Sequence, residues 1–514
     1  MSVRRPTTFT GTDGSVTAVV DALSTMGFEG ADAGPHSRSV LDTFDGRLHA
    51  AGLRLELHDD GGRALVLWSG DGSPPAHAVA DVAPVWPADV PAGPLRQRIA
   101  EVTKERALLP LLEISSQRRV LRRLDRRGKA VASVEVHERL EVDGAIGAHV
   151  PAWAAEVHAV VGHEDVVELL GTRLAMLGLT PARGDLSSSL AELTGRPLGG
   201  RSSSPTVPMD AADDALASFR RVLLNLYETI EQNLPGTVDD TDPEFLHELR
   251  VAVRRTRSVL AEGRNVLPDD TRQHFREVFS EIGQVTGPPR DLDVYVLGWA
   301  EQVAGLSDAD ITALEAVREE LERRRVAAKA ELARSLRSAT TAAAFEAWRS
   351  WLTDLDVVAE QPAPIGPVVA ARIARAQRKV LRDGRAITPA SHPERLHDLR
   401  KDAKKLRYLL ECFGGLLPTK GRKAFVGQLK ALQDNLGEHQ DAEVQMAQLR
   451  TLAHDLRDAP GVDTDVLLAI GRLGEQLDRR RSSERAAFAD RFAAYDTKPN
   501  RRALDDLLAP LAQR

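Results

Sequence analysis

The sequence predicts a mixed α and β domain followed by an all-α domain, and three observations lead to this prediction. Residues 1–194 alternate short β-branched runs with Gly-rich turns, as β-hairpins require. Residues 195–208 (GRPLGGRSSSPTVP) have the composition of a linker. In residues 209–514 apolar residues recur at spacings of three and four, while Pro and Gly are mainly confined to breaks.

The individual strands and helices are predicted from the same patterns. In the first domain, Gly-rich turns at residues 59–62 and 125–128 separate the runs that are typical of strands. The expected strands are Leu53–Leu57, Ala64–Trp68, Arg118–Leu124 and Ala130–Val136. The expected helices of the second domain are Ala217–Asn233, Glu244–Glu262, Ile311–Ala339, Val368–Arg382, Glu394–Phe413, Arg422–Leu436 and Val466–Ala494.

Composition limits the classes of function. The formal net charge of −7 means that any anion site must be a local cluster of Lys and Arg. Aromatic residues make up 4% of the chain, too few for clustered base-stacking platforms. The one cysteine, Cys412, excludes an internal disulfide framework and fits a reducing compartment. Because we find neither a long apolar run nor a signal-peptide pattern after Met1, we expect a cytoplasmic protein.

A repeat relates the two halves of the helical domain. The sequence PEFLHELR at residues 243–250 matches PERLHDLR at residues 393–400, an offset of 150 residues. Further residues match in the same register: Arg254 with Lys404, Arg255 with Lys405, Arg257 with Arg407, Gly287 with Gly437, Asp291 with Asp441, Asp293 with Glu443 and Val294 with Val444. We therefore expect a tandem pair of helical bundles at about residues 212–360 and 362–510.

Each copy of the repeated helix carries a basic stripe beside an apolar stripe. With His247 at 0° and about 100° per residue, Arg250, Arg254 and Arg257 fall at about 300°, 340° and 280°. The apolar residues, among them Leu249, span roughly 200° to 260°. A cationic stripe that borders the core-facing stripe points toward a groove or an interface between bundles. Because the second copy has the same arrangement, we expect the two helices to contribute about equally.

The helix before the second copy adds more cations. Residues 372–407 contain twelve Lys and Arg and four Asp and Glu, a net charge of +8 within a chain of −7. Arg donates two parallel hydrogen bonds to phosphate and Lys supplies a point charge, so a repeating phosphate polymer suits such a surface. The candidate anion-binding residues are His247, Arg250, Arg254, Arg255, Arg257, Arg372, Arg375, Lys379, Arg382, His397, Arg400, Lys401, Lys404, Lys405, Arg407 and Lys430.

A solvated face is the alternative interpretation of these charges. Few carboxylates stand at pairing distance along the helices, although Asp398 can pair with Lys401, and a merely solvated face has little reason to repeat in register. His247 alone is more often a structural histidine than a ligand. Asp291 and Asp293 can cap helices or pair with arginine, and metal ligation is the lesser option for them. We expect no catalytic residue, no metal and no other cofactor.

These residues resemble the CHAD family, whose pattern of H-x-x-R followed by basic residues occurs twice. The two copies begin at His247 and His397, and the accompanying turns are RDLDV at residues 290–294 and LGEHQD at residues 436–441. The resemblance covers about residues 210–510. It implies two pseudo-symmetric four-helix bundles around a basic surface, binding of inorganic polyphosphate by that surface, and no catalytic activity.

The first domain resembles the CYTH family, the triphosphate-tunnel fold. The similar segments are LDTFDGRL at residues 41–48, AGLRL at residues 51–55 and the strand that contains Glu156. The departures are VRRPTTF at residues 3–9 in place of an acidic E-x-E-x-K motif, Glu56 in place of an arginine, Trp68-Ser69 in place of a lysine and His158 in place of an acid. The resemblance implies an antiparallel β tunnel.

The departures affect the residues that such a tunnel needs for catalysis. Two-metal phosphoryl chemistry requires carboxylates to hold the ions, so we expect a degenerate tunnel. The basic residues that remain are Arg54, Arg118, Arg122 and Arg183. Of these, Arg118 and Arg122 are either tunnel cations or the solvated face of a strand.

Three functions follow as hypotheses. The first is a non-enzymatic protein that binds inorganic polyphosphate through the helical domain. The alternative is a metal-dependent triphosphatase or polyphosphate-processing enzyme that uses the first domain. The third is a nucleic-acid or nucleotide-binding protein on the same basic face. The missing acids disfavour the enzyme, and the few aromatics with the negative net charge disfavour nucleic acid. We expect no membrane partner, a cytoplasmic location and association with polyphosphate granules, and the sequence leaves the oligomeric state open.

Overall fold

A computed structural model divides the chain into two units, Met1–Ser203 and Ser204–Arg514. The boundary falls within residues 195–208, where the sequence predicts a linker, although Leu198 packs against a core of the first unit. The structure describes residues 6–11, 16–30, 32–71, 73–143, 150–159, 163, 165–196, 198–200, 207–354, 362–457 and 463–512. Residues 3–5 of the VRRPTTF segment and residues 201–206 of the expected linker lie outside these ranges.

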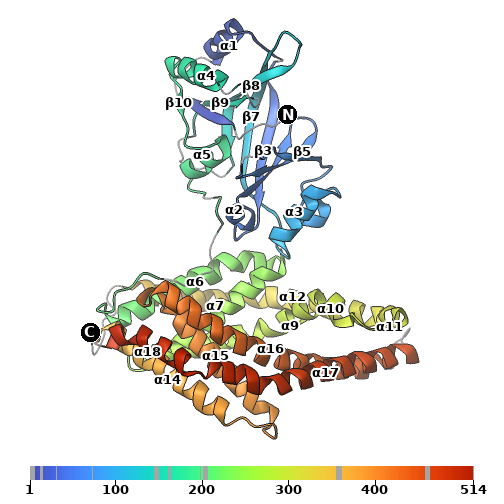
Figure 1. Cartoon of the computed structure of the whole chain (residues 1–514), viewed down its shortest axis with the longest axis vertical. Helices are drawn as coiled ribbons and strands as arrows, with labels where there is room; N and C mark the ends of the chain where they lie inside the picture. The colour runs from blue at the N-terminus through green and yellow to red at the C-terminus, as the bar shows by residue number, and fades with distance from the viewer. Residues whose placement is uncertain are drawn as a thin grey trace. The chain divides into compact units, whose positions relative to one another are not determined.

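The first unit is built on one antiparallel sheet with the strand order β10-β1-β9-β8-β7-β3-β4-β5-β6, in which β2 also pairs with β7 (Figure 1). The described strands are β1 Thr7–Gly11, β2 Phe28–Gly30, β3 Gly34–Asp42, β4 Leu53–Asp59, β5 Arg63–Ser69, β6 Ala76–Val79, β7 Leu109–Leu124, β8 Ala130–Val142, β9 Trp153–Ala159 and β10 Thr180–Pro181. The described helices are α1 Val16–Thr25, α2 Arg47–Ala50, η1 Pro87–Asp89, α3 Pro94–Thr103, α4 Asp165–Met176 and α5 Leu186–Leu193. The predicted α+β class is confirmed.

All four expected strands form, but two of them are longer than expected. β7 begins at Leu109 rather than at Arg118, and β8 continues to Val142 rather than ending at Val136. The additional residues of β7 pair with β3 on one side, and β8 pairs with β7 on the other. Pairing partners that are distant in the sequence thus extend both strands beyond the short runs that local composition shows.

Alternation along the strands separates an apolar face from a polar one. In β4, Leu53, Leu55 and Leu57 enter a hydrophobic core, while Arg54 and Glu56 between them are buried on the opposite face. Because successive side chains of a strand point to opposite faces, the polar residues of neighbouring strands meet on one side of the sheet. The first unit therefore has a buried polar interior in addition to its apolar cores.

The second unit is helical, as the sequence predicts. The described helices are α6 Ala215–Val238, α7 Pro243–Glu262, α8 Asp269–Val285, α9 Gly287–Leu297, α10 Trp299–Val303, α11 Asp308–Ala313, α12 Glu315–Leu336, α13 Ala339–Thr353, α14 Ile365–Arg385, α15 Pro393–Cys412, η2 Gly414–Leu416, α16 Thr419–Leu456, α17 Thr464–Tyr495 and α18 Lys498–Ala512. The two longest, α16 and α17, lie side by side (Figure 1).

The repeat in the sequence is also a repeat of helix boundaries. α7 and α15 begin at Pro243 and Pro393 and end at Glu262 and Cys412, so both boundaries keep the offset of 150. Each helix begins with proline, whose missing N–H costs nothing in the first turn. The residue before each proline caps the helix, since its side chain accepts the backbone N–H of the second helical residue.

Both repeats contribute to the same hydrophobic cores. The largest core contains Phe219 from the first repeat and Phe413 from the second, with their ring centroids 4.9 Å apart. A second core joins Tyr295 of the first repeat to Leu449 and Leu473 of the second. The two repeats therefore fold against each other and share their cores.

Two helix predictions differ from the structure. α16 continues to Leu456 rather than ending at Leu436, because Gly437 stays helical while Leu449 and Leu452 pack in a core. The segment expected as one helix from Ile311 to Ala339 is broken at Leu314, between α11 and α12, and again after Leu336, where Ser338 caps α13 by accepting the N–H of Thr341.

None of the helices in the described part of the chain is both long enough and apolar enough to cross a bilayer.

Candidate functional site

A groove with a volume of about 670 Å³ lies between α7, α8 and α15 in the helical unit. Its lining residues are Arg254, Arg257, Ser258, Ala261, Gln273, Arg276, Glu277, Ser280, Lys401, Lys404, Lys405 and Tyr408. The amphipathic pattern of α7 explains its place: Leu249 and Val253 are buried in the core, and the basic stripe beside them faces the groove. We refer to this feature as the α7–α15 groove.

Four cations of the α7–α15 groove have no carboxylate partner. Arg254, Arg257, Arg276 and Lys404 form no ion pair within 4.0 Å among the residues that the structure describes. The Nε atom of Arg254 is also buried without a hydrogen-bond partner. Unpaired like charges held together repel one another, so an anion in the groove would stabilise them.

Crowding of these charges changes their acidity. Burial, together with the neighbouring charges of Arg400 and Arg254, lowers the pKa of Lys404 to about 8. Burial and Arg254 likewise lower the pKa of Arg250 to about 10. Arg250 lies beneath the groove and donates hydrogen bonds from Nη1 to Thr286 Oγ1 at 3.1 Å and to the Gly283 carbonyl at 3.4 Å. Arg250 therefore ties α7 to the end of α8.

Two ion pairs connect the repeats, and their cations occupy equivalent positions in the repeat. Arg255 of α7 contacts Glu411 of α15, with Nη2 and Oε2 2.7 Å apart, and both side chains are mostly buried. Its counterpart Lys405 of α15 pairs with Glu262 of α7. In each pair, a cation of α7 or α15 contacts an acid at the C-terminal end of the other of these two helices. The recurrence of a basic residue at these two positions therefore has a structural reason.

The two repeats differ at the position of Glu411. The equivalent residue in the first repeat is Ala261, which lines the α7–α15 groove. Glu411 also accepts a bond from Arg407 at 2.7 Å, and Arg407 contacts Gln433 at 3.3 Å. Arg257, the counterpart of Arg407, has no such partner. The expectation of equal contributions from the two helices is therefore not supported by their surroundings.

The other expected site residues lie outside the α7–α15 groove, except Lys401 and Lys405, which line it but pair with Asp398 at 3.2 Å and with Glu262 respectively. Seven of them have side-chain or backbone partners: Arg400 with Asp441 at 3.0 Å, His397 with Gln440 at 2.5 Å, Arg372 with Glu262 at 3.6 Å and with the carbonyl of Arg264, Lys379 with Asp402, Arg382 with Asp383 at 2.7 Å, and Arg255 and Arg407 with Glu411. His247 is half-buried, while Arg375 and Lys430 are exposed. The sequence predicts few ion pairs along each helix, but acids from other helices complete several pairs that this prediction did not cover.

Two acidic residues of the second repeated block, Asp293 and Asp441, form ion pairs. Asp293 is buried, with its carboxylate 2.8 Å from Lys329 Nζ and 3.3 Å from Arg325 Nη1. Asp291 lies in the field of Arg250, and Asp441 holds Arg400. The pairing interpretation of these acids, rather than helix capping, agrees with these contacts.

Sequence reasoning missed Arg276, which lines the groove from α8. The segment that forms α8 was not among the expected helices, so its residues were not considered. Its first turn carries Asp269 and Asp270 and its pattern is strongly amphipathic, which are signals that would have identified the helix.

A second pocket, with a volume of about 350 Å³, lies on the polar side of the sheet in the first unit. Its charged and imidazole lining residues are Arg38, Arg54, Glu56, His58, Asp60, His77, Arg118, Glu135, Glu156 and His158. Arg118 therefore faces this interior, whereas Arg122 is exposed. We refer to this pocket as the sheet pocket.

The cations of the sheet pocket are already paired with carboxylates. Arg38 holds Glu156 with two hydrogen bonds of 2.5 and 3.3 Å, and both residues are almost completely buried. Although burial alone would raise it, Arg38 and a hydrogen bond from His137 hold the pKa of Glu156 well below its usual value. Arg118 contacts Glu135 at 3.1 Å and also pairs with Asp60.

Glu56 is held in the same way. Arg54 Nε lies 3.0 Å from Glu56, and the other end of Arg54 pairs with Asp185. Trp68 Nε1 and Ser187 Oγ donate to the Glu56 carboxylate at 3.0 and 2.8 Å. The two residues that replace an arginine and a lysine of the CYTH pattern, Glu56 and Trp68, thus bond to each other. The pocket compensates its charges internally.

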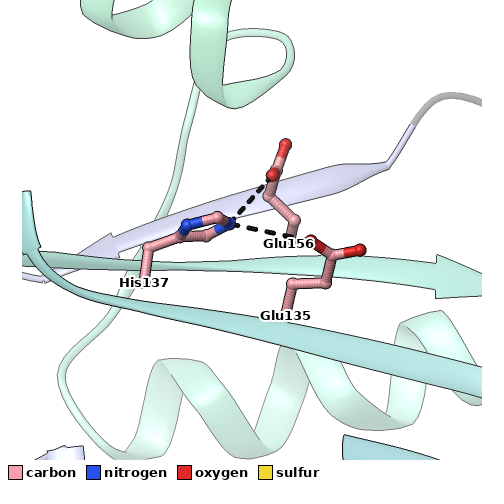
Figure 2. A group of neighbouring side chains, drawn as sticks. All are labelled: Glu135, His137 and Glu156. Atoms are coloured by element: carbon pink, nitrogen blue, oxygen red, sulfur yellow. Dashed lines mark hydrogen bonds and ion pairs between the residues drawn. The ribbon is translucent and has the colours of Figure 1, made fainter. Parts of the chain in front are cut away.

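Glu135, His137 and Glu156 form the group in the described residues that could hold a metal ion, since their ligand atoms lie within 4.8 Å of one another (Figure 2). Figure 2 shows the His137 ring directed at both carboxylates, with Nε2 3.2 Å from Glu156 and 4.0 Å from Glu135. The same carboxylates also carry Arg38 and Arg118. These donors therefore form an ion-pair network with the arginines of the pocket.

The cross-repeat pair predicts a measurable coupling. Arg255→Ala and Glu411→Ala should each destabilise the helical unit, because each removes one member of a mostly buried ion pair. A double-mutant cycle followed by helical circular dichroism in denaturant should give a coupling energy of about 1 kcal/mol or more. The exposed pair Arg349–Glu346 is the control, for which we expect about 0.5 kcal/mol or less. Equal couplings for the two pairs would contradict the structural role.

Comparison with known proteins identifies part of the helical unit. Residues 221–450 match the CHAD domain family. A crystal structure of the CHAD domain from the plant Ricinus communis is 25% identical, has a TM-score of 0.48, and covers 56% of this chain and 94% of its own. PptA from Streptomyces chartreusis is 16% identical with a TM-score of 0.44, covering 55% and 100%.

The first unit is similar to a putative adenylate cyclase from Vibrio parahaemolyticus, with 10% identity, a TM-score of 0.25, and coverage of 37% of this chain and 98% of that one. Among curated proteins no match is found. The family match coincides with the helices that carry the α7–α15 groove, and the chain therefore contains a CHAD domain at residues 221–450.

Proposed function

We propose that the helical unit binds inorganic polyphosphate in the α7–α15 groove without chemical conversion. The observation that carries the proposal is the set of four unpaired cations, Arg254, Arg257, Arg276 and Lys404, around one groove. Most other cations on α7 and α15 have a carboxylate partner, as Arg255 has in Glu411, while Arg250 donates to Thr286 and Gly283 and Arg395 is exposed. The groove is where several cations without a carboxylate partner in the described part of the chain lie together. The presence of a CHAD domain, with the polyphosphate binding that the family resemblance implies, supports the same ligand.

The chemistry of the groove suits a flexible phosphate polymer. Arginine can donate paired hydrogen bonds to phosphate oxygens, and lysine adds a point charge, so neither needs a ligand of fixed shape. The one aromatic residue of the lining, Tyr408, is largely buried and lies beneath Arg255, 6.0 Å from ring centroid to guanidinium carbon. It offers no open face for stacking a base. These features favour polyphosphate over nucleic acid.

We also propose that the first unit is a degenerate CYTH-like tunnel without triphosphatase activity. In a triphosphate tunnel, arginines and lysines must be available for substrate phosphates and carboxylates for metal ions. Here Arg38, Arg54 and Arg118 are bound to the carboxylates of the same pocket. A substrate would have to break several buried ion pairs to enter. The metal-dependent triphosphatase is thus the second candidate, favoured only by the Glu135–His137–Glu156 group.

The proposed partner and location follow from the ligand. Inorganic polyphosphate is the partner, and neither nucleic acid nor a membrane is part of the proposal. We propose that the protein is cytoplasmic and associates with polyphosphate granules.

The two repeats should contribute unequally to binding. Arg257→Gln should weaken binding of long-chain polyphosphate about tenfold or more, because it removes an unpaired cation that is free to donate charge-assisted hydrogen bonds. Arg407→Gln, the matched change in the second repeat, should change the affinity less than about threefold, because Glu411 already holds Arg407. Titration calorimetry at low and moderate salt measures both.

Two outcomes would contradict the proposed groove. If both variants stay folded and bind like the unaltered protein, the cations of the groove are a solvated face. If Arg257→Gln and Arg407→Gln weaken binding equally, binding does not depend on whether the arginine is paired with a carboxylate. The site then extends beyond the α7–α15 groove.

Binding should weaken as the pH rises through about 8. Lys404 has its pKa lowered to about 8, so it is charged below that pH and neutral above it. The charged form binds a polyanion, so affinity should fall between about pH 7 and 9.5, by up to about tenfold for one charged contact. Lys404→Arg should keep its charge throughout and remove most of this dependence. An identical pH profile for the two proteins would exclude Lys404 as a ligand-binding group.

The full-length protein should release no phosphate from tripolyphosphate with Mg²⁺ or Mn²⁺ above the protein-free rate, because the arginines of the sheet pocket are held by Glu56, Glu135 and Glu156. A malachite-green assay against a known triphosphatase measures this. Turnover near about 1 per second would establish the second candidate function instead.

A further inference from the structure

The turn between β7 and β8 in the first unit is the most densely basic exposed segment of that unit. Residues 118–129 contain seven Lys and Arg and one acid, Asp125, in a chain whose net charge is −7. The inner two cations have carboxylate partners: Arg118 pairs with Glu135, and Arg119 lies 3.4 Å from Asp32. We call the outer five, Arg122, Arg123, Arg126, Arg127 and Lys129, the hairpin cations.

The hairpin cations have no carboxylate partner within 4.0 Å in the part of the chain that the structure describes. All are exposed except Arg123, which is half-buried. The position of these charges at the end of a long strand pair separates them from the carboxylates of the sheet pocket. Asp125 in the turn and Glu29 opposite Arg122 offset part of this charge, and an anionic ligand would stabilise the remainder.

The turn is built without the help of these side chains. Asp125 Oδ1 accepts the backbone N–H groups of Arg127 at 2.7 Å and Lys129 at 2.9 Å, which lower the pKa of Asp125. The Asp125 N–H donates to the Lys129 carbonyl at 2.8 Å, and Gly128 adopts a φ of 75°, which favours glycine. The acid and the glycine shape the turn, so its guanidinium groups have no part in folding.

We propose that the hairpin cations are a second, separate contact site for the same linear polyphosphate that the helical unit binds. The inference rests on the proposed function for the identity of the ligand, and on the hairpin alone for the site. Four of these cations are exposed within eight residues, at the end of β7 and in the turn that follows it, so a flexible phosphate chain can contact several of them at once. Two sites on one chain would bind a long polymer with increased avidity.

The residues around the hairpin favour phosphate over other polyanions. Residues 118–129 include no Phe, Tyr or Trp, so the segment offers no surface on which bases could stack. Leu124 is exposed at 54%, but one apolar side chain provides little membrane insertion. A phosphate polymer needs only the charges that are present.

The test uses the full-length protein with Arg126→Gln and Arg127→Gln combined. The matched control combines Lys104→Gln and Arg173→Gln, two exposed cations of the same unit outside the hairpin. Affinity for long-chain polyphosphate is measured at several salt concentrations. The hairpin variant should bind more weakly than the control, and the slope of log K against log salt should fall by about one unit, since each lost phosphate contact removes about 0.7.

Each outcome has a distinct meaning. If the hairpin variant binds and responds to salt like the control, the proposal is wrong. If it keeps polyphosphate affinity but loses binding to duplex DNA or to phosphatidylserine vesicles, the proposal is also wrong and the hairpin has that other ligand. If Arg257→Gln binds like the unaltered protein while the hairpin variant is weakened, the hairpin site stands and the α7–α15 groove fails.

Discussion

The close packing of α7 against α15 is the constraint on which the helical unit depends. Each helix carries a basic stripe beside its apolar one, so bringing the apolar stripes together also brings two cationic stripes together. Without compensation, like charges at this distance would oppose the packing. Glu262 and Glu411 provide that compensation, each from the C-terminal end of one helix to a cation on the other. The shared core and the crossed pairs are thus two parts of one interface.

This constraint decides which cations remain for a ligand. Arg255 and Lys405 are used at the interface, and Arg407 shares Glu411 with Arg255. The repeat is symmetric in its cations but not in its acids, because Ala261 stands where the second repeat has Glu411. Uncompensated charge therefore collects on one side, in the α7–α15 groove. Both copies of the repeated helix place a cation, Arg255 or Lys405, in an ion pair between the repeats. At the next matched position, Arg407 pairs with Glu411, whereas Arg257 has no carboxylate partner among the described residues.

The sequence was sufficient for the local features and insufficient for the tertiary ones. Apolar spacing predicted both ends of α7 and α15 to within one residue, and the register of the repeat predicted which residues are equivalent. The charge of +8 over residues 372–407 was misleading, because Glu262, Glu411 and Asp441, which neutralise cations within it, lie outside that range. Which acid meets which cation depends on contacts between helices, and no spacing along one helix contains that information. Arg276 was missed because α8 was not among the expected helices, although its acidic first turn and amphipathic pattern are visible in the sequence.

The two units treat buried charge in opposite ways, and this contrast bears on what each can bind. In the sheet pocket every arginine has a carboxylate, and the pKa of Glu156 is held low by Arg38 and His137, so the charges stabilise one another without a ligand. In the α7–α15 groove, burial and neighbouring cations lower the pKa of Lys404. The charged form of Lys404 is therefore less stable there than in water. An anion that raises this pKa on binding gains that energy as affinity, by linkage between protonation and binding. The charges of the sheet pocket therefore compensate one another, whereas the cations of the α7–α15 groove would be stabilised by a bound polyanion.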